Sequence, residues 1–354
     1  MPHAPNPSGP YSGHDAVLEQ AARWKAENKG VALATVVATW GSSPRPVGSL
    51  LAVDSDGRLT GSVSGGCIEG EVVAEALDVI ETGQHKLLDF GVTDDAAWQA
   101  GLTCGGEVRI LVEKIGWVMD GELFAQLIKD RAGKRAVVLA INLKSGHQKL
   151  VYPFETQRDS RDSNNLSSAA AEAALADRGR TVETPDGDVF LNVFNPPLRM
   201  IIVGAVHISQ PLSVMAREAG YQVTVVDPRR SFATPERFPD MDLRVEWPDE
   251  ALQSLDLDRR TAVVSLTHDP KLDDPALAVA LNSDAFYVGA LGSNKSHGKR
   301  VARLRERNIA DALIGQIHGP IGLDIGAKSP SEIAVSILAE VTQNLRQPPN
   351  QSDG

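Results

Sequence analysis

The chain has 354 residues, a net charge of −11 at pH 7 and two cysteines. This length predicts about two domains. Because acidic and basic residues are interspersed, the charge pattern argues against nucleic acid or an anionic membrane as a partner. No apolar run is long enough to span a bilayer, and the polar, proline-rich start does not resemble a signal peptide. Together with the two cysteines, these features predict a cytoplasmic protein with reduced thiols.

Residues 14–155 predict an α+β domain. Helices are expected at 14–29, 68–81 and 120–131, and strands at 31–39, 48–54, 58–63, 84–90, 106–113, 135–143 and 147–153. The polar stretch 156–168 lacks periodicity and predicts a linker, followed by a short helix at 169–178. The whole segment 156–197 is therefore expected to connect two domains.

Residues 198–346 predict a Rossmann-like domain with a doubly wound parallel sheet. The apolar runs LRMIIV, YQVTVVD, TAVVSLT and AFYVGAL lack strict alternation, as is typical of strands buried on both faces. Helices are expected near 210–219, 273–281 and 294–307. A last helix begins at Ser329-Pro330-Ser331-Glu332, which has the composition of a capping box. The predicted fold class is α/β, an N-terminal α+β domain joined to this sheet.

Cys67 lies between the pair Gly65-Gly66 and the start of the helix expected at 68–81. Backbone N–H groups at a helix start favour a thiolate, which attacks electrophiles and binds soft metals. The alternative is a small buried apolar side chain at a tight turn.

Two further positions in this half suggest ligand contacts. Arg45 lies between two prolines, and its guanidinium suits a phosphate or a pterin, although it could equally be a solvated surface arginine. Cys104 precedes Gly105-Gly106, a turn that allows close approach to a ligand. If Cys67 and Cys104 converge, they form a soft pair suited to a soft metal or to carrying sulfur. If they do not, Cys104 is structural.

The first turn of the C-terminal half is an incomplete dinucleotide fingerprint. Gly204 is present, but Val206 and Ser209 replace the second and third glycines. Asp227 ends the next strand, where related folds bind a ribose hydroxyl. This pocket could take a nucleotide or a pterin phosphate, or the fold could bind no nucleotide at all. His207 lies inside the turn.

Other histidines lie near the ends of the predicted strands. His268 and Asp269 follow a strand at the edge where doubly wound folds bind ligands, and His318 is similarly placed. No cysteine and histidine spacing here has zinc-ligand geometry.

Several motifs together resemble the XdhC/CoxI family. They are TWGSSPRPVG, GSVSGGCIEGEV, GLTCGGE, IVGAVH, VDPR, YVGALGS and GPIGLDIGA, in the family's order. The resemblance covers nearly the whole chain apart from the tails and the central linker. Val206 departs from the family's GAGH turn, which puts any ligand at that turn in doubt.

The resemblance implies a maturation factor for xanthine dehydrogenases and related molybdenum hydroxylases. Such a protein binds molybdenum cofactor (molybdopterin), protects it and inserts the sulfurated form into an apo enzyme. It implies a dimer or other homo-oligomer and a cysteine desulfurase partner, with Cys67 as a sulfur carrier or ligand and Cys67 and Cys104 as molybdenum ligands. The implied cofactor-binding residues are Arg45, Gly65, Gly66, Cys67, Cys104, Gly105, Gly106, Gly204, His207 and Asp227.

Two enzyme classes are the rivals to this interpretation. An NAD(P)-dependent oxidoreductase would use the Rossmann-like half, but the missing glycines weigh against NAD(P) binding. An iron–sulfur dehydrogenase is not among them, because a cluster with four cysteine ligands needs more than the two cysteines present. A hydrolase or nucleotidyltransferase acting on a nucleotide-bearing molybdopterin has no triad or paired-carboxylate signature in its support.

Overall fold

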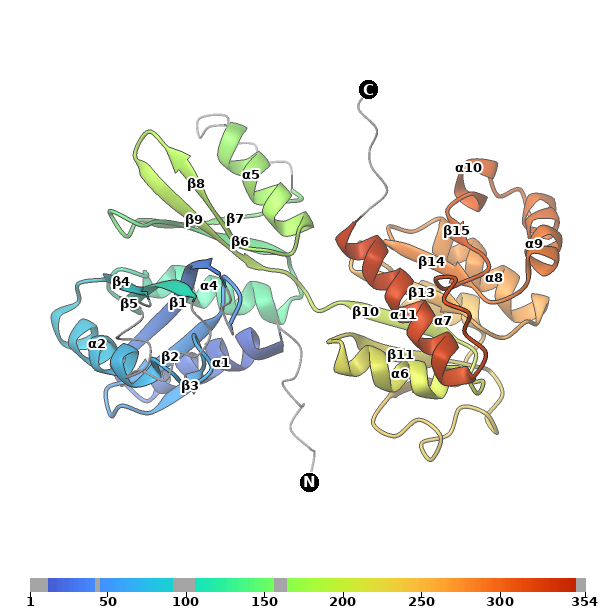
Figure 1. The fold of residues 1–354 in the computed structure, drawn as a ribbon, viewed down its shortest axis with the longest axis horizontal. Coiled ribbons are helices and arrows are strands. Elements are labelled where there is room, and N and C mark those ends of the chain that lie inside the picture. The colour runs from blue at the N-terminus through green and yellow to red at the C-terminus, as the bar shows by residue number, and fades with distance from the viewer. Residues whose placement is uncertain (1–11, 42–44, 92–105, 156–163, 348–354) are drawn as a thin grey trace. The chain divides into compact units, whose positions relative to one another are not determined.

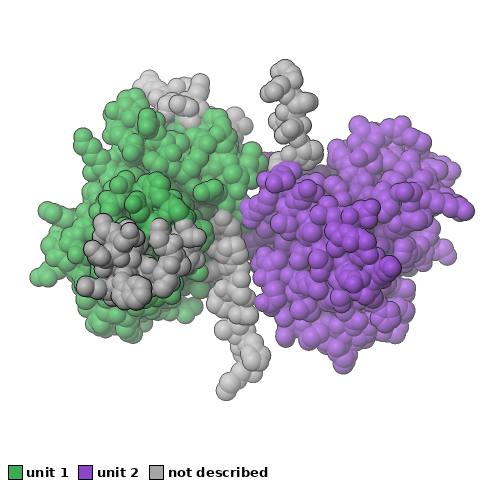
Figure 2. Space-filling model, in the orientation of Figure 1, with its two compact units in different colours: residues 1–196 green, residues 197–354 purple. Residues whose placement is uncertain are grey.

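The computed structural model describes residues 12–41, 45–91, 106–155 and 164–347. Cys104 and Gly105 lie outside these ranges. The chain divides into two compact units, residues 1–196 and 197–354, which are coloured separately in Figure 2. Each unit is described by itself.

The first layer of unit 1 is a five-stranded antiparallel sheet in the order β3-β2-β1-β5-β4 (Figure 1). The strands are β1 (Val31–Trp40), β2 (Leu50–Asp54), β3 (Leu59–Gly61), β4 (Lys86–Phe90) and β5 (Glu107–Lys114), and the helices in this part of the chain are α1 (Ser12–Ala26) and α2 (Glu69–Thr82). Strand β1 is buried on both faces: Val31 and Leu33 pack with α1, whereas Ala32 and Ala34 pack with α2. The strands predicted at 48–54 and 58–63 are confirmed as the antiparallel pair β2 and β3.

A second antiparallel sheet, in the order β7-β6-β9-β8, completes unit 1. Its elements are α4 (Gly121–Ala132), β6 (Val137–Asn142), β7 (Gln148–Val151), α5 (Asn164–Leu175), β8 (Arg180–Thr184) and β9 (Gly187–Phe194). Residues 164–194 fall in the predicted connecting segment, but they form α5 and two strands of this sheet. The sequence pattern misses β8 because this edge strand is mostly polar and exposed.

The antiparallel pairings bring the motif-bearing loops of unit 1 to one end of the first sheet. Strands β1 and β3 finish at this end, and β2 and β5 begin there. The loop that contains Arg45, the loop that contains Cys67, and Gly106 at the start of β5 are therefore neighbours in the topology. The fold thus gathers segments that are about 20 to 60 residues apart in the chain.

Unit 2 is a six-stranded parallel sheet in the order β12-β11-β10-β13-β14-β15, which confirms the predicted Rossmann-like fold. Its strands are β10 (Arg199–Val203), β11 (Gln222–Val226), β12 (Asp242–Arg244), β13 (Thr261–Ser265), β14 (Tyr287–Ala290) and β15 (Ile317–His318). Its helices are α6 (Ser209–Glu218), α7 (Pro248–Ser254), α8 (Pro270–Leu281), α9 (Asn294–Glu306), α10 (Asp311–Ile314) and α11 (Pro330–Arg346).

Helices cover both faces of this sheet. Apolar residues of α6 and α11 pack on one face, and residues of α7, α8 and α9 pack on the other (Figure 1). The capping box predicted for the last helix is confirmed, because the Ser329 hydroxyl accepts from the Glu332 N–H while the Glu332 side chain accepts from the Ser329 N–H.

The turn after β10 requires a glycine. Gly204 has φ of +107°, and a Cβ at this position would lie 2.5 Å from Thr267 Cγ2. We expect Gly204→Ala to destabilise unit 2 by about 2 kcal/mol or more, through backbone strain and this contact. Gly298→Ala is the control, because a Cβ there on α9 meets open space and should stabilise by about 0.5–1 kcal/mol. Urea unfolding of both variants measures the difference, and equal midpoints would contradict the prediction.

Candidate functional site

The loop over residues 62–68 closes around the carboxylate of Glu69. The Ser62 hydroxyl donates to Glu69 Oε1 at 2.7 Å, and the backbone N–H groups of residues 63–66 donate to the same carboxylate at 2.8–3.2 Å. The Ser64 hydroxyl also donates to it. Burial alone would raise the pKa of Glu69, but the hydrogen bonds from Ser64 and Ser62 lower this pKa from its ordinary 4.5 to about 2.

Cys67 is exposed at the tip of this loop. Its backbone N–H and that of Ile68 donate to the Ser64 hydroxyl oxygen at 3.1 and 3.2 Å. The N–H groups of residues 63–68, which lead into α2, are therefore bonded to the Ser64 hydroxyl or the Glu69 carboxylate. The exposure of Cys67 does not fit the alternative of a buried apolar side chain. It leaves the thiol accessible to a ligand.

Arg45 contacts the same loop, because its Nε donates to the Ser62 carbonyl at 3.3 Å. Burial, and then the positive charges of Arg131 and Arg45, lower the pKa of His14 to about 4. Arg45 therefore lies close enough to act electrostatically on the buried His14. The structure thus brings Arg45, Gly65, Gly66 and Cys67 together, whereas the convergence of Cys67 with Cys104 stays a prediction.

In unit 2, Asp227 is already bonded within the protein. Its buried carboxylate accepts from the Ala205 N–H at 2.8 Å, in the turn that follows Gly204. It also forms an ion pair with the Arg229 guanidinium at 2.7 Å. Burial opposes ionisation, but the hydrogen bonds from Arg229 and Ala205 hold the pKa of Asp227 below its ordinary value. The carboxylate expected to bind a ribose thus holds the glycine turn instead.

The remaining positions of the fingerprint have different environments. Val206 is half-buried against the core, and His207 is exposed in the turn. Ser209 is fully buried and donates to the Gly204 carbonyl. Ser209 thus occupies the place where a third glycine allows close helix packing, and compensates with a hydrogen bond.

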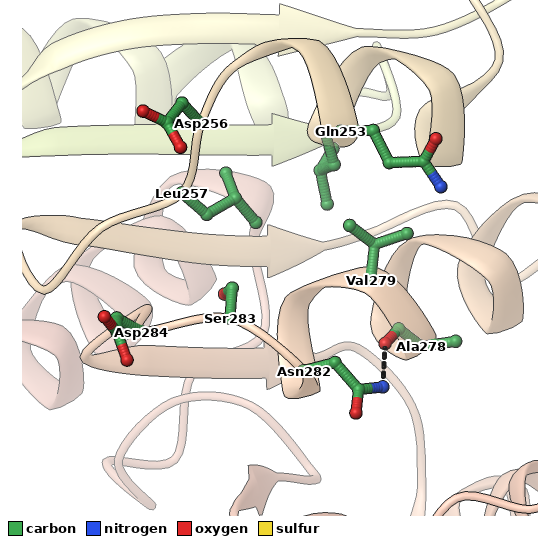
Figure 3. A pocket seen from close by; sticks show the side chains of 9 residues that line it. Gln253, Asp256, Leu257, Ala278, Val279, Asn282, Ser283 and Asp284 are labelled. Atoms are coloured by element: carbon green, nitrogen blue, oxygen red, sulfur yellow. Dashed lines mark hydrogen bonds between the residues drawn. The ribbon is translucent and has the colours of Figure 1, made fainter.

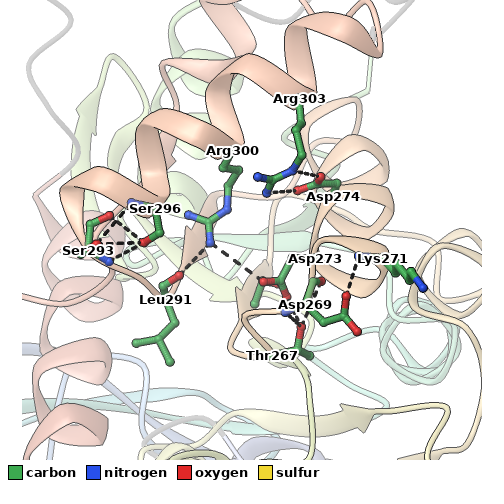
Figure 4. A network of polar contacts seen from close by, with 11 residues as sticks. Thr267, Asp269, Lys271, Asp273, Asp274, Leu291, Ser293, Ser296, Arg300 and Arg303 are labelled. Carbon is green, nitrogen blue, oxygen red and sulfur yellow. Dashed lines mark hydrogen bonds and ion pairs between the residues drawn. The ribbon is translucent and has the colours of Figure 1, made fainter.

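A buried polar network lies at the carboxyl ends of β13 and β14 (Figure 4). Asp273 accepts from the hydroxyls of Ser265 at 2.7 Å and Thr267 at 2.5 Å, and Arg300 lies 3.9 Å away. The Arg300 Nη2 also donates to the Leu291 carbonyl at 2.7 Å. Contacts within the protein thus occupy part of the edge at which doubly wound folds bind ligands, but the buried Nε and Nη1 of Arg300 have no hydrogen-bond partner there among the residues that the structure describes.

The other candidate histidines and Asp269 are placed by local structure. His268 is exposed with φ of +62°, and Asp269 caps α8 by accepting from Lys271 N–H. His318 bonds Glu340 at 3.2 Å and stacks on Tyr287. Among residues 12–41, 45–91, 106–155 and 164–347, no three His, Cys, Asp or Glu side chains are grouped to hold a metal ion.

A cavity of about 680 Å³ lies between α7 and α8 (Figure 3). Leu252 and Val279 give it an apolar wall, and Asp256 and Asp284 lie at its rim. These residues precede β13 and β14, so the cavity is at the amino ends of the strands. Because doubly wound folds bind ligands at the carboxyl ends, this cavity is not a candidate for a Rossmann ligand.

Sequence reasoning missed the part played by Glu69 in closing the loop and the pairing of Asp227 with Arg229. The first has a local signal, since Ser62, Ser64 and the glycine pair precede a glutamate at the helix start. Asp227 and Arg229 lie only two residues apart in the motif VDPR.

Within the described part of the chain, no helix is long and apolar enough to cross a membrane.

We expect Glu69→Gln to loosen the loop, because the amide has one acceptor oxygen for a site that surrounds two. The pKa of Glu69 is depressed in the folded state, so its stabilising effect is present above its ordinary pKa of 4.5 and is lost as pH falls towards about 2. The stability difference between wild type and variant should therefore shrink between about pH 6 and about pH 2.5, measured by urea unfolding. Glu71→Gln, exposed in the same helical turn, is the control. A constant difference for Glu69→Gln would contradict the assignment.

Comparisons with known proteins identify the family of the chain. A family model described as XdhC Rossmann domain matches residues 200–341, and one described as XdhC and CoxI family matches residues 24–91. Together they span more than half of the chain.

Two curated proteins are similar to this chain over nearly their whole length. One is named as a probable xanthine dehydrogenase subunit from Bacillus subtilis, 29% identical over 94% of this chain and 96% of that protein. Another is the "Molybdenum cofactor insertion chaperone PaoD" of Escherichia coli, 26% identical over 96% of this chain and 91% of that protein. A crystal structure of a xanthine dehydrogenase from Bacillus halodurans shares the fold, with a TM-score of 0.68 and 23% identity over 95% of this chain and 97% of that one. This chain therefore belongs to the XdhC and CoxI family.

Proposed function

We propose that this protein is a chaperone that binds molybdenum cofactor, protects it and inserts the sulfurated form into a molybdenum hydroxylase. The client would be an enzyme of the xanthine dehydrogenase or carbon monoxide dehydrogenase type. The observation that carries the proposal is similarity to a molybdenum cofactor insertion chaperone over nearly the whole of both chains. The gathering of Arg45 and Cys67 at one end of the first sheet supports it.

The described residues at this end have the chemistry that the cargo would need. An accessible thiol is a soft ligand suited to molybdenum and to sulfur transfer, and Cys67 is exposed on a loop fixed by Glu69. A guanidinium suits a phosphate group, and Arg45 lies against the same loop. In this proposal Cys67 contacts the metal end of the cofactor and Arg45 contacts its phosphate.

Further parts of the proposal concern the rest of the molecule. A cysteine desulfurase would supply the sulfur, and the chain would work in the cytoplasm as a homo-oligomer such as a dimer. Unit 2 would either contribute His207 and Asp227 to cofactor retention or serve as a scaffold that docks the client. The second role is favoured because Asp227 is engaged by Arg229 and by the glycine turn.

Purified protein should carry molybdenum and pterin at no more than about one per chain, and should activate an apo molybdenum hydroxylase without oxidising xanthine itself. Metal analysis, pterin fluorescence and client activity measure these properties. Cys67→Ala should lose activation while keeping its circular dichroism spectrum, because the exposed thiol adds little to the core. Cys104→Ala should show a milder loss. Robust hydride transfer from xanthine to NAD by the isolated chain would overturn the proposal, and full activation by Cys67→Ala would make that thiol dispensable.

The rival function, an NAD(P)-dependent oxidoreductase, gives a separate expectation. NAD and NADP should give no saturable heat at micromolar concentrations in titration calorimetry, because Val206 obstructs the pyrophosphate and Asp227 is paired with Arg229. Val206→Gly should gain little alone. The double variant Val206→Gly, Arg229→Ala should gain more, because it also releases the Asp227 carboxylate. Submicromolar binding by the wild type would show that this reasoning is wrong.

A further inference from the structure

A second cavity, of about 370 Å³, opens beside the Arg45 loop in unit 1. One wall is the end of β1 with Trp40, together with Val47 from the loop that follows. The other wall is the corner between α5 and β8, including Glu172, Ala176 and Arg180. We call this cavity the Trp40 groove. Its volume lies in the range of small-molecule sites.

The backbone of β1 holds Trp40 at the surface. The register between β1 and β5 shifts between Val36 and Ala38, and such bulges commonly redirect side chains next to binding sites. Trp40 then pairs with Glu107 and remains 47% exposed. Arg109, itself paired with Asp89, lies 5.5 Å from the indole centroid. A large aromatic side chain is thus fixed in position and open to solvent.

The rim of the groove carries polar groups of both signs. Glu172 and Arg180 form an ion pair at 2.7 Å, and both are exposed. Arg178 also lines the groove, and Arg45 lies two residues before Val47. The groove therefore offers an aromatic surface, a hydrogen-bond acceptor, several donors and a nearby positive charge.

We infer that the Trp40 groove binds the pterin ring system of the cofactor. A pterin is flat, its faces stack on an indole, and its edge carries both donors and acceptors. Glu172 and Arg180, both exposed, carry polar atoms beyond the Nη2–Oε2 bond that joins them and so suit that edge, and Arg45, two residues before Val47, contacts the Cys67 loop at the Ser62 carbonyl. The identification of the ligand as a pterin rests on the proposed function. The location of the site rests on the cavity and its lining residues alone.

The test uses the full chain and 6-hydroxymethylpterin, a pterin without metal or phosphate, with binding followed by pterin fluorescence. Trp40→Ala should weaken binding about tenfold or more, the loss expected for one stacking partner. Trp40→Phe should have a smaller effect. Ala176→Phe, which fills the groove from the α5 side without altering Trp40, should also block binding. Trp117→Ala is the control, because Trp117 is exposed beyond the opposite end of β5.

Molybdenum retention by the same variants separates this inference from the proposed function. If the wild type retains molybdenum but Trp40→Ala and Ala176→Phe bind pterin with unchanged affinity, the groove assignment is overturned and the proposed chaperone function is not. If the wild type binds free pterin through the groove but neither retains molybdenum nor activates a client, the groove assignment is supported and the proposed chaperone function is overturned. Loss of pterin affinity in both groove variants, with Trp117→Ala unchanged, is the expected result.

Discussion

The Glu69 carboxylate is the constraint on which the N-terminal site depends. One side chain accepts from four consecutive backbone N–H groups and two hydroxyls, so it fixes the whole turn that precedes α2. Because Gly65 and Gly66 both have positive φ, this turn is accessible to few other residues. The exposed Cys67 thus lies next to a turn that these hydrogen bonds fix, and such support keeps a reactive side chain in one position.

Unit 2 bonds two buried carboxylates within the protein near the positions where a Rossmann fold usually meets a dinucleotide. Asp227 bonds the glycine turn and Arg229, and Asp273 bonds two hydroxyls near Arg300. A ligand that displaced these contacts would leave buried charges unpaired, which is costly in a low-dielectric interior. Asp227 is therefore engaged where a dinucleotide-binding fold usually contacts a ribose, which weighs against NAD(P) binding, whereas the buried Arg300 keeps Nε and Nη1 without a hydrogen-bond partner in the described ranges of the chain.

Features set by neighbouring residues could be predicted from the sequence. The capping box at Ser329 and the buried runs of the parallel sheet follow from local composition. Strand β8 could not be predicted in this way, because a polar edge strand is specified by its partner β9 rather than by its own pattern. The Trp40 groove joins residues more than 130 positions apart, so only the fold reveals it. Asp227 was recognised, but the choice between a ribose and the Ala205 N–H depends on backbone geometry.

The openness of the N-terminal site is itself an argument about function. An enzyme gains from excluding water around the reacting atoms, because electrostatic interactions strengthen in a dry cavity. A carrier has the opposite requirement, since its cargo must leave for a second protein, and each enclosing contact slows release. Cys67 is exposed, and Trp40 is half-exposed beside a groove rather than within a closed chamber. Exposed residues that bind the cofactor would allow both recognition and release, as the proposed delivery to a client requires.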